Sequence, residues 1–359
     1  MSSIWQVARG LRASYRDSDL RHRVEQLNGR LDKTLAPDDS ANSDHAETAR
    51  EYYDICSHLM IYGWGESLHF APLTASESLE DSKLRHQRLM IDKLDLREPM
   101  SVIDVGCGIG GPMRTVVRES GVRVTGINSS EVQLARARSL TAEAGLSDMI
   151  DYVETSFMDM GAIDNNTYDR AYAIESTCHA PDKVGAFTEI ARVLKPGALL
   201  WGQEMCLTDT FDPDNAQHQD IKQELMRGIA LRKIATFAEV NAALESAGFE
   251  VIEGADRGTA ENGSTTPWYQ PMEARSGTRS STLRGTPLGR RLAIGSARVG
   301  ETLRVLPRGT AEIAKLLDRT AEAYVAGGKT GIFTPLYCFV ARKPLGDPPG
   351  ETATIGHVC

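Results

Sequence analysis

The sequence lacks the patterns that mark several large classes of protein. No stretch approaches the roughly 18 apolar residues of a membrane-spanning helix, and the N-terminus has no apolar core of a secretory signal. The 6 cysteines form no C-x-x-C pair, and no histidine cluster has metal-ligand spacing. We therefore expect an intracellular protein with reduced thiols, no transmembrane span and no bound metal.

Acidic residues outnumber basic ones, and aromatic residues are scarce. The formal net charge is −9, which argues against nucleic acid as a partner. Only 6% of the residues are aromatic, but 41% are hydrophobic, enough for a substantial core. A length of 359 residues suits a core domain with an appended one.

The most informative motif is a glycine-rich loop that follows an apolar run. Residues 102–105 read Val-Ile-Asp-Val, and Gly106, Gly108 and Gly110 follow. Pro112 then suits the first turn of a helix, where its missing N–H costs nothing. A strand, a tight loop and a helix start in this order typically cradle a nucleotide-like ligand.

Two classes of cofactor fit the glycine spacing. Gly106, Gly108 and Gly111 match the G-x-G-x-x-G of dinucleotide sites, while Gly106, Gly108 and Gly110 match the G-x-G-x-G of S-adenosylmethionine methyltransferases. Asp104 favours S-adenosylmethionine, because a carboxylate attracts its ammonium group and would repel a pyrophosphate. The alternative is an Asp104 that only anchors its own loop.

Other cofactor contacts are expected beside this loop. The next strand, residues 123–127, ends in Asn128 rather than in the acidic residue that usually grips a ribose. An amide bonds a hydroxyl more weakly than a carboxylate does. The further predicted contacts are Cys107, Gln133, Ser156, Phe157 and Glu175.

Apolar and amphipathic segments alternate after the loop. Strands are expected at 123–127, 152–153, 168–174 and 198–201, and helices at 131–144 and 183–194. The alternation predicts an α/β fold with a doubly wound, mostly parallel sheet. Asp104, Asn128, Glu175 and Glu204 follow strands, so we expect them at one edge of the sheet.

Several blocks of the chain together resemble the sterol C24-methyltransferase family. The N-terminal blocks are 62–65, 69–70, 104–112 and 173–181, and the C-terminal blocks are 267–271, 326–329, 333–335 and 339–344. The resemblance covers about residues 51–344. It implies a Rossmann-like class I methyltransferase core that binds S-adenosylmethionine, an N-terminal lid and a C-terminal α+β substrate domain.

Composition at the two ends and the resemblance between them divide the chain into expected segments. These are an extension and linker at 1–50, an aromatic lid at 51–80, the S-adenosylmethionine-binding core at 81–207, a sterol methyltransferase-like domain at 208–345 and a disordered tail at 346–359.

The chemistry that the resemblance implies is methyl transfer to the C24 side-chain double bond of a sterol. Methyl addition leaves a carbocation, which shifts a hydride and loses a proton. Placement of the reactants contributes roughly 7–11 kcal/mol, and each cation–π contact about 0.5–2 kcal/mol. The alternatives are another terpenoid or small-molecule acceptor, and a non-catalytic relative that binds sterol or S-adenosylmethionine.

The first candidate catalytic residues lie in the lid. Tyr62, Trp64 and Phe70 are expected to face the cation, or else to pack the lid on the core. Glu66 and His69 are candidates for orienting substrate or accepting a proton. The alternatives are a solvated glutamate and a core histidine with satisfied hydrogen bonds.

Further candidates follow two strands. By resemblance, Glu175 lines the junction of cofactor and sterol. His179 or Glu204 is expected to bind the sterol 3-hydroxyl or to take the final proton, and a structural role of His179 in its turn is the alternative.

The chain departs from the family pattern at three places. Residues 60–61 replace an acidic-aromatic pair, and Ser156 replaces an aspartate that would meet the adenine. Arg227 replaces an acidic residue, and this charge reversal predicts a changed acceptor.

Arginine is concentrated in one C-terminal region. The residues are Arg275, Arg279, Arg284, Arg290, Arg291, Arg298, Arg304 and Arg308, against only Glu273 and Glu301. The region predicts peripheral contact with an anionic membrane, the endoplasmic reticulum in a eukaryote, at about 1 kcal/mol per well-placed charge. Pairing with acids elsewhere and a purely cytoplasmic protein are the alternatives. Assembly into a homo-oligomer is left open.

Overall fold

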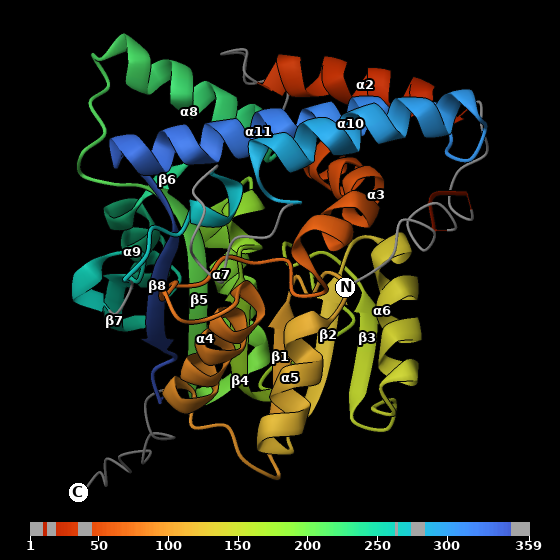
Figure 1. Cartoon of the computed structure of the whole chain (residues 1–359). Helices are drawn as coiled ribbons and strands as arrows, with labels where there is room; N and C mark the ends of the chain where they lie inside the picture. The colour runs from red at the N-terminus through yellow and green to blue at the C-terminus, as the bar shows by residue number, and fades with distance from the viewer. Residues whose placement is uncertain (1–9, 13–18, 35–44, 263–264, 274–283, 346–359) are drawn as a thin grey trace, which may run out of the picture.

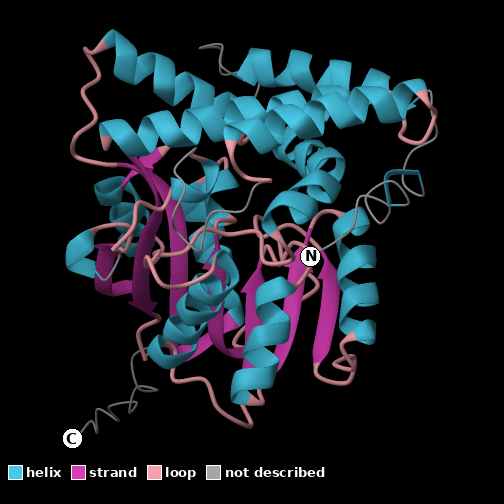
Figure 2. Ribbon diagram, viewed as in Figure 1, coloured by secondary structure: helices cyan, strands magenta, loops and turns pink. Residues whose placement is uncertain are grey.

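The computed structural model describes residues 10–12, 19–34, 45–262, 265–273 and 284–345 (Figures 1 and 2). Its centre is an eight-stranded sheet in the order β3-β2-β1-β4-β5-β8-β7, with β6 paired to β5. The strands are β1 (Ser101–Val105), β2 (Arg123–Asn128), β3 (Ile150–Glu154), β4 (Tyr168–Ile174), β5 (Leu194–Leu207), β6 (Ala235–Thr236), β7 (Glu250–Asp256) and β8 (Phe333–Arg342).

Helices cover both faces of the sheet and its upper edge. They are α2 (Asp19–Thr34), α3 (His45–Trp64), α4 (Leu79–Lys93), α5 (Gly111–Ser120), α6 (Glu131–Glu143), α7 (Lys183–Val193), α8 (Ala216–Gly228), α9 (Phe237–Ser246), α10 (Pro287–Thr302) and α11 (Thr310–Thr330). Strands β1 to β5 pair in parallel, whereas β8 is antiparallel to both its neighbours. The prediction of a doubly wound, mostly parallel sheet is confirmed.

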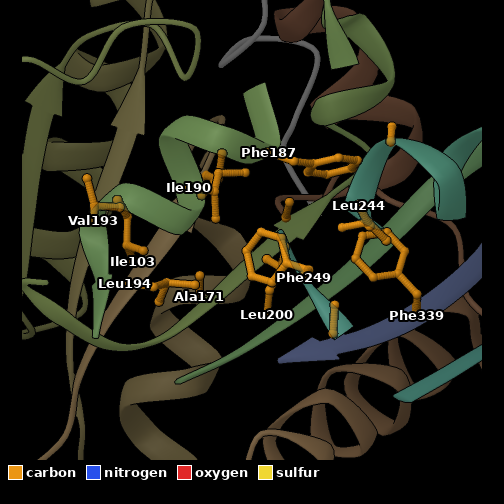
Figure 3. Packing of buried hydrophobic residues seen from close by; sticks show 14 of the residues in the cluster. Ile103, Ala171, Phe187, Ile190, Val193, Leu194, Leu200, Leu244, Phe249 and Phe339 are labelled. Carbon is orange, nitrogen blue, oxygen red and sulfur yellow. The ribbon is translucent and has the colours of Figure 1, made fainter. Parts of the chain in front are cut away.

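The two faces of the sheet are buried because apolar residues occupy consecutive strand positions. Ile103, Ala171 and Leu200 pack with residues of α7 and α9 (Figure 3). Their neighbours Val102 and Tyr172 pack instead with residues of α4 and α5. The core therefore lies on both sides of the strands, and the polar residues that follow them remain at the edge.

Some element boundaries differ from those expected. Strand β5 begins at Leu194 rather than at residue 198, because the turn-like residues 195–197 form an irregularity inside the strand. Residues 45–50, expected in the linker, belong to α3. The expected domain boundary at 207 stays a prediction, although β7 and β8 of the following segment complete the same sheet. The expected tail, 346–359, lies outside the described residues.

A layer of helices lies above the sheet edge at which β1, β4 and β5 end (Figure 1). Leu27 of α2, Ile55 of α3 and Leu316 of α11 share one buried cluster of this layer. None of the described helices is long and apolar enough to cross a membrane.

Candidate functional site

The glycine loop joins β1 to α5 in the backbone conformation that its glycines permit. Gly106, Gly108 and Gly110 have φ values of +85°, +54° and +72°. A Cβ on Gly106 would clash with the side chain of Ser176, so this glycine allows a close approach of two chain segments. A Cβ on Gly108 would meet no atom within 4 Å, so the loop leaves space for a ligand there.

Asp104, the residue before the last in strand β1, carries a buried carboxyl group next to the loop. Burial raises its pKa to about 8, although the neighbouring Tyr172 hydroxyl acts in the opposite direction. No basic side chain among the described residues pairs with it. A buried carboxyl group with a raised pKa and no basic partner fits a ligand that carries a positive charge, such as the ammonium group of S-adenosylmethionine.

Asn128 lies at the end of β2, and both polar atoms of its side-chain amide form hydrogen bonds within the protein. Its Nδ2 donates to Oε1 of Gln133 at 2.8 Å, and its Oδ1 accepts from the backbone of Ser130 at 3.0 Å. The Ser130 hydroxyl caps α6 and donates to the carboxylate of Asp54. Asp54 belongs to α3, so the helix that also carries Tyr62 and Trp64 of the lid reaches the cofactor edge. The sequence carries no local signal for this contact.

The remaining predicted cofactor residues surround the same edge. Cys107 is buried, and its backbone N–H donates to the carbonyl of Ile127. After β3, the hydroxyl of Ser156 accepts from the backbone of Met158 at 3.1 Å. Phe157 is half-buried against the core. Their contacts with a cofactor stay predictions.

Glu175 connects the core to the lid. It follows β4 with a φ of +52°, a conformation rarely adopted by a residue with a side chain. Its Oε1 accepts hydrogen bonds from the backbone of Phe70 at 2.7 Å and from Nε2 of Gln203 at 2.6 Å. Burial raises its pKa to about 8 despite these two bonds. Gln203 was missed by sequence reasoning, since nothing local marks it.

Aromatic rings gather around Phe70, and their contact with a substrate cation stays a prediction. The ring centroid of Phe70 lies 5.2 Å from that of Trp64, 5.3 Å from that of Trp268 and 4.9 Å from that of Tyr324. The rings come from the lid, from the segment before α10 and from α11. Trp268 lies in a block that carries the family resemblance, whereas Tyr324 has no such signal.

Tyr62 lies apart from this aromatic cluster. Its ring contacts the guanidinium group of Arg284, whose central carbon is 4.0 Å from the ring centroid. Arg284 also donates to the Tyr62 carbonyl at 3.2 Å. The Tyr62 ring therefore stacks with a cation of the protein itself.

Glu66 and His69 both have protein partners. Glu66 forms an ion pair with Arg114 of α5 at 2.8 Å. The His69 ring bonds the Phe70 carbonyl through Nδ1 at 2.7 Å and Gln87 through Nε2 at 2.8 Å. Burial lowers the pKa of His69 to about 3. This geometry favours the interpretation of His69 as a core histidine with satisfied hydrogen bonds.

His179 and Glu204 are also held by neighbouring side chains. Nε2 of His179 shares a hydrogen bond of 2.9 Å with the Tyr53 hydroxyl, and burial lowers the pKa of His179 to about 3. Glu204 is fully buried, pairs with Lys183 at 2.9 Å and accepts from the Thr177 hydroxyl. The two carboxylate oxygens of Glu204 are therefore both engaged by side chains of the protein.

Arg227, the charge reversal, has a partner in the N-terminal extension. Its Nε donates to Oδ1 of Asp32 on α2 at 2.7 Å. The contact joins α8 to α2, and the predicted effect of Arg227 on the acceptor stays a prediction.

Comparisons with known proteins show which families the sequence matches. The family described as Sterol methyltransferase C-terminal matches residues 280–345, and the one described as Methyltransferase domain matches residues 103–202. The chain is 41% identical to the cycloartenol-C-24-methyltransferase of Arabidopsis thaliana over 86% of this chain and 90% of the relative. It is 35% identical to a sterol 24-C-methyltransferase of Saccharomyces cerevisiae, over 92% of this chain and 87% of that protein.

A similar fold occurs in solved structures. The cyclopropane synthase MmaA2 from Mycobacterium tuberculosis aligns with a TM-score of 0.64, at 16% identity, over 83% of this chain and 98% of that chain. At that identity the likeness concerns the fold alone.

Proposed function

The chain belongs to the sterol 24-C-methyltransferase family, and from this membership we propose that it transfers a methyl group to C24 of a sterol side-chain double bond. The observation that carries the proposal is the pair of hydrogen bonds that Glu175 accepts from Phe70 and Gln203. Its carboxyl group links Phe70, at the centre of the aromatic cluster, to the strand edge that bears the glycine loop. Cofactor and acceptor sites are thereby adjacent, as methyl transfer requires.

The methyl donor is S-adenosylmethionine, which supplies an electrophilic methyl group when it is bound. Asp104 holds the ammonium group of the donor, because this buried carboxyl group pairs with no basic side chain in the described part of the chain. Asn128 and Gln133 face the ribose, and Ser156 and Phe157 flank the adenine. The open side of Gly108 admits the donor to the loop.

At the proposed acceptor site, aromatic rings and the carboxyl group of Glu175 are the groups that can stabilise a carbocation. Methyl addition to an alkene leaves a carbocation on the sterol, and aromatic faces attract a cation. Trp64, Phe70, Trp268 and Tyr324 supply those faces. Water would capture the cation, so an apolar and aromatic lining also protects the product.

Glu175 is the proposed proton acceptor. A base is most effective when its pKa lies near the working pH, and the pKa of Glu175 is about 8. The pKa values of His69 and His179 are about 3, too low for a useful base, and Glu204 is paired with Lys183. We assign these three residues to positioning.

The sterol binds chiefly against residues 208–345 and the lid under this proposal. A sterol partitions into bilayers, so the enzyme must also meet a lipid surface. We propose that the arginine-rich region after residue 274 makes that contact.

Incubation with methyl-labelled S-adenosylmethionine and a panel of Δ24 sterols tests the proposal. We expect mass spectrometry to locate the label at C24. Binding of S-adenosylmethionine without methylation of any sterol would overturn it and would point to another terpenoid acceptor.

A further inference from the structure

The helix α10 carries an unusual apolar stripe on its exposed side. Leu288, Leu292 and Val299 are 62%, 56% and 59% exposed, and Leu303 at the helix C-cap is 68% exposed. At 100° per residue these four positions fall within about 60° of the helix circumference. They are half of the large hydrophobic residues that are exposed among the described residues.

This stripe is not the face by which α10 packs on the protein. Gly289 and Ala297 are the buried positions of the helix. Arg290 donates to Asp318 of α11 at 2.6 Å and to the carbonyl of Met272 at 2.7 Å. Figure 1 shows α10 running beside α11 in the layer above the sheet. A surface helix of this kind normally exposes a polar face opposite the packed one, whereas α10 exposes aliphatic side chains.

The residues that flank the stripe are cationic. Arg291, Arg298, Arg304 and Arg308 are exposed, and none of them forms an ion pair with an acidic residue in the described part of the chain. The acidic residue within α10, Glu301, is turned inward, and its carboxylate accepts from the backbone of α11. The exposed face of α10 is therefore both aliphatic and positively charged.

We propose that this face of α10 docks on an anionic lipid bilayer. Aliphatic side chains in one stripe insert at the level of the acyl boundary, and arginines beside them meet lipid phosphates, as in interfacial amphipathic helices. Charge complementarity selects this occupant, because four arginines without described acidic partners would repel one another across a symmetric contact with a second copy.

The position of α10 links this docking to the acceptor site. Arg284, three residues before α10, stacks on Tyr62 of the lid. Docking of α10 thus brings the lid to the lipid surface, where a sterol would leave the bilayer. This link rests on the proposed function, whereas the docking itself rests on the residues of α10.

Vesicle flotation of the full chain tests the docking. One variant combines Leu288→Ser with Leu292→Ser, and another combines Arg291→Gln with Arg298→Gln. The matched controls are Ile252→Ser, an aliphatic side chain 45% exposed on β7, and Arg118→Gln on α5. We expect binding to phosphatidylserine vesicles to fall roughly tenfold with the leucine pair and roughly 30-fold with the arginine pair. The controls should bind like the wild type.

Equal binding to neutral and anionic vesicles, or unchanged binding of both paired variants, would overturn the proposal. A dimer that the leucine pair dissociates in analytical ultracentrifugation, without loss of flotation, would also overturn it and assign the stripe to a second copy. Circular dichroism confirms that the variants are folded. Methylation of detergent-dispersed sterol reports the proposed function separately, because that assay needs no vesicle, and we expect it to be unchanged in all four variants.

Discussion

The carboxylate of Glu175 accepts a hydrogen bond of 2.7 Å from the backbone amide of Phe70, a residue 105 positions earlier in the chain. The bond joins the lid to the end of β4, and Gln203 on β5 donates to the same oxygen. The positive φ of Glu175 is maintained by these contacts, since a residue with a side chain disfavours it. Glu175 therefore combines a strained backbone conformation, a buried carboxyl group and a hydrogen bond to the aromatic cluster.

Replacement of Glu175 by glutamine should lower kcat by about 10²- to 10⁴-fold, the usual contribution of a general base. The amide retains a carbonyl oxygen for the Phe70 and Gln203 bonds, so we expect the fold to persist. Steady-state kinetics on a Δ24 sterol measures the effect, with Glu245→Gln on the surface of α9 as the control. A kcat within about twofold of the wild-type value would remove Glu175 from the proposed chemistry.

The pH dependence of stability should follow the two buried acids. The pKa values of Asp104 and Glu175 are raised from 3.8 and 4.5 to about 8 in the folded chain. At a pH between the ordinary pKa values and about 8, the folded state retains protons that the unfolded state has lost. The free energy of unfolding therefore falls as the pH rises through this range. Urea denaturation of the ligand-free protein between about pH 5 and 8 checks this sign. Glu175→Gln should flatten the decline, and an unchanged slope in that variant would contradict the raised pKa.

Binding of the methyl donor should release protons through Asp104. The ammonium group favours the ionised carboxylate, so binding near pH 6.5 should release about one proton per site. Isothermal titration calorimetry in buffers of different ionisation enthalpy measures this number. Asp104→Asn should abolish the release and weaken binding by at least about 30-fold. Full proton release in Asp104→Asn would assign the titration to another group.

Local sequence predicted those parts of the site that depend on local backbone. The glycine loop and Asp104 belong to a contiguous segment whose strand, turn and helix start are each encoded by neighbouring residues. The contacts of Gln203 with Glu175 and of Asp54 with Ser130 depend on segments that approach only in the folded chain. Periodicity has no signal for such pairs.

Tyr62 shows that local sequence also fails to predict which group a side chain contacts. An aromatic residue beside glycines was expected to face the substrate cation. The ring of Tyr62 instead contacts the guanidinium group of Arg284, which lies 222 residues later in the chain. The residue type predicted a cation–π contact, and the fold determines which cation makes it.

The aromatic cluster should act on the reaction more than on stability. Phe70→Leu keeps most of the apolar volume but removes a π face, so kcat should fall about 2- to 30-fold, the range of one cation–π contact. Phe187→Leu, in the separate buried cluster that α7 shares with β4, is the control. It should lower the melting temperature without a matching loss of kcat per folded molecule. Equal kinetic losses in both variants would mean that packing, and not the π face, is responsible.

The contact of Arg227 with Asp32 should stabilise helix packing without choosing the acceptor. The Arg227 side chain is largely buried, but that of Asp32 is 63% exposed, so water screens the pair. A double-mutant cycle of Arg227→Ala and Asp32→Ala, followed by urea denaturation, should give a coupling of about 0.5–1 kcal/mol. The order of preference among Δ24 sterols should be the same in both single variants and in the wild type, because the pair joins α8 to α2. A changed order in Arg227→Ala but not in Asp32→Ala would show that Arg227 contacts the acceptor, and the charge reversal would then be a determinant of specificity.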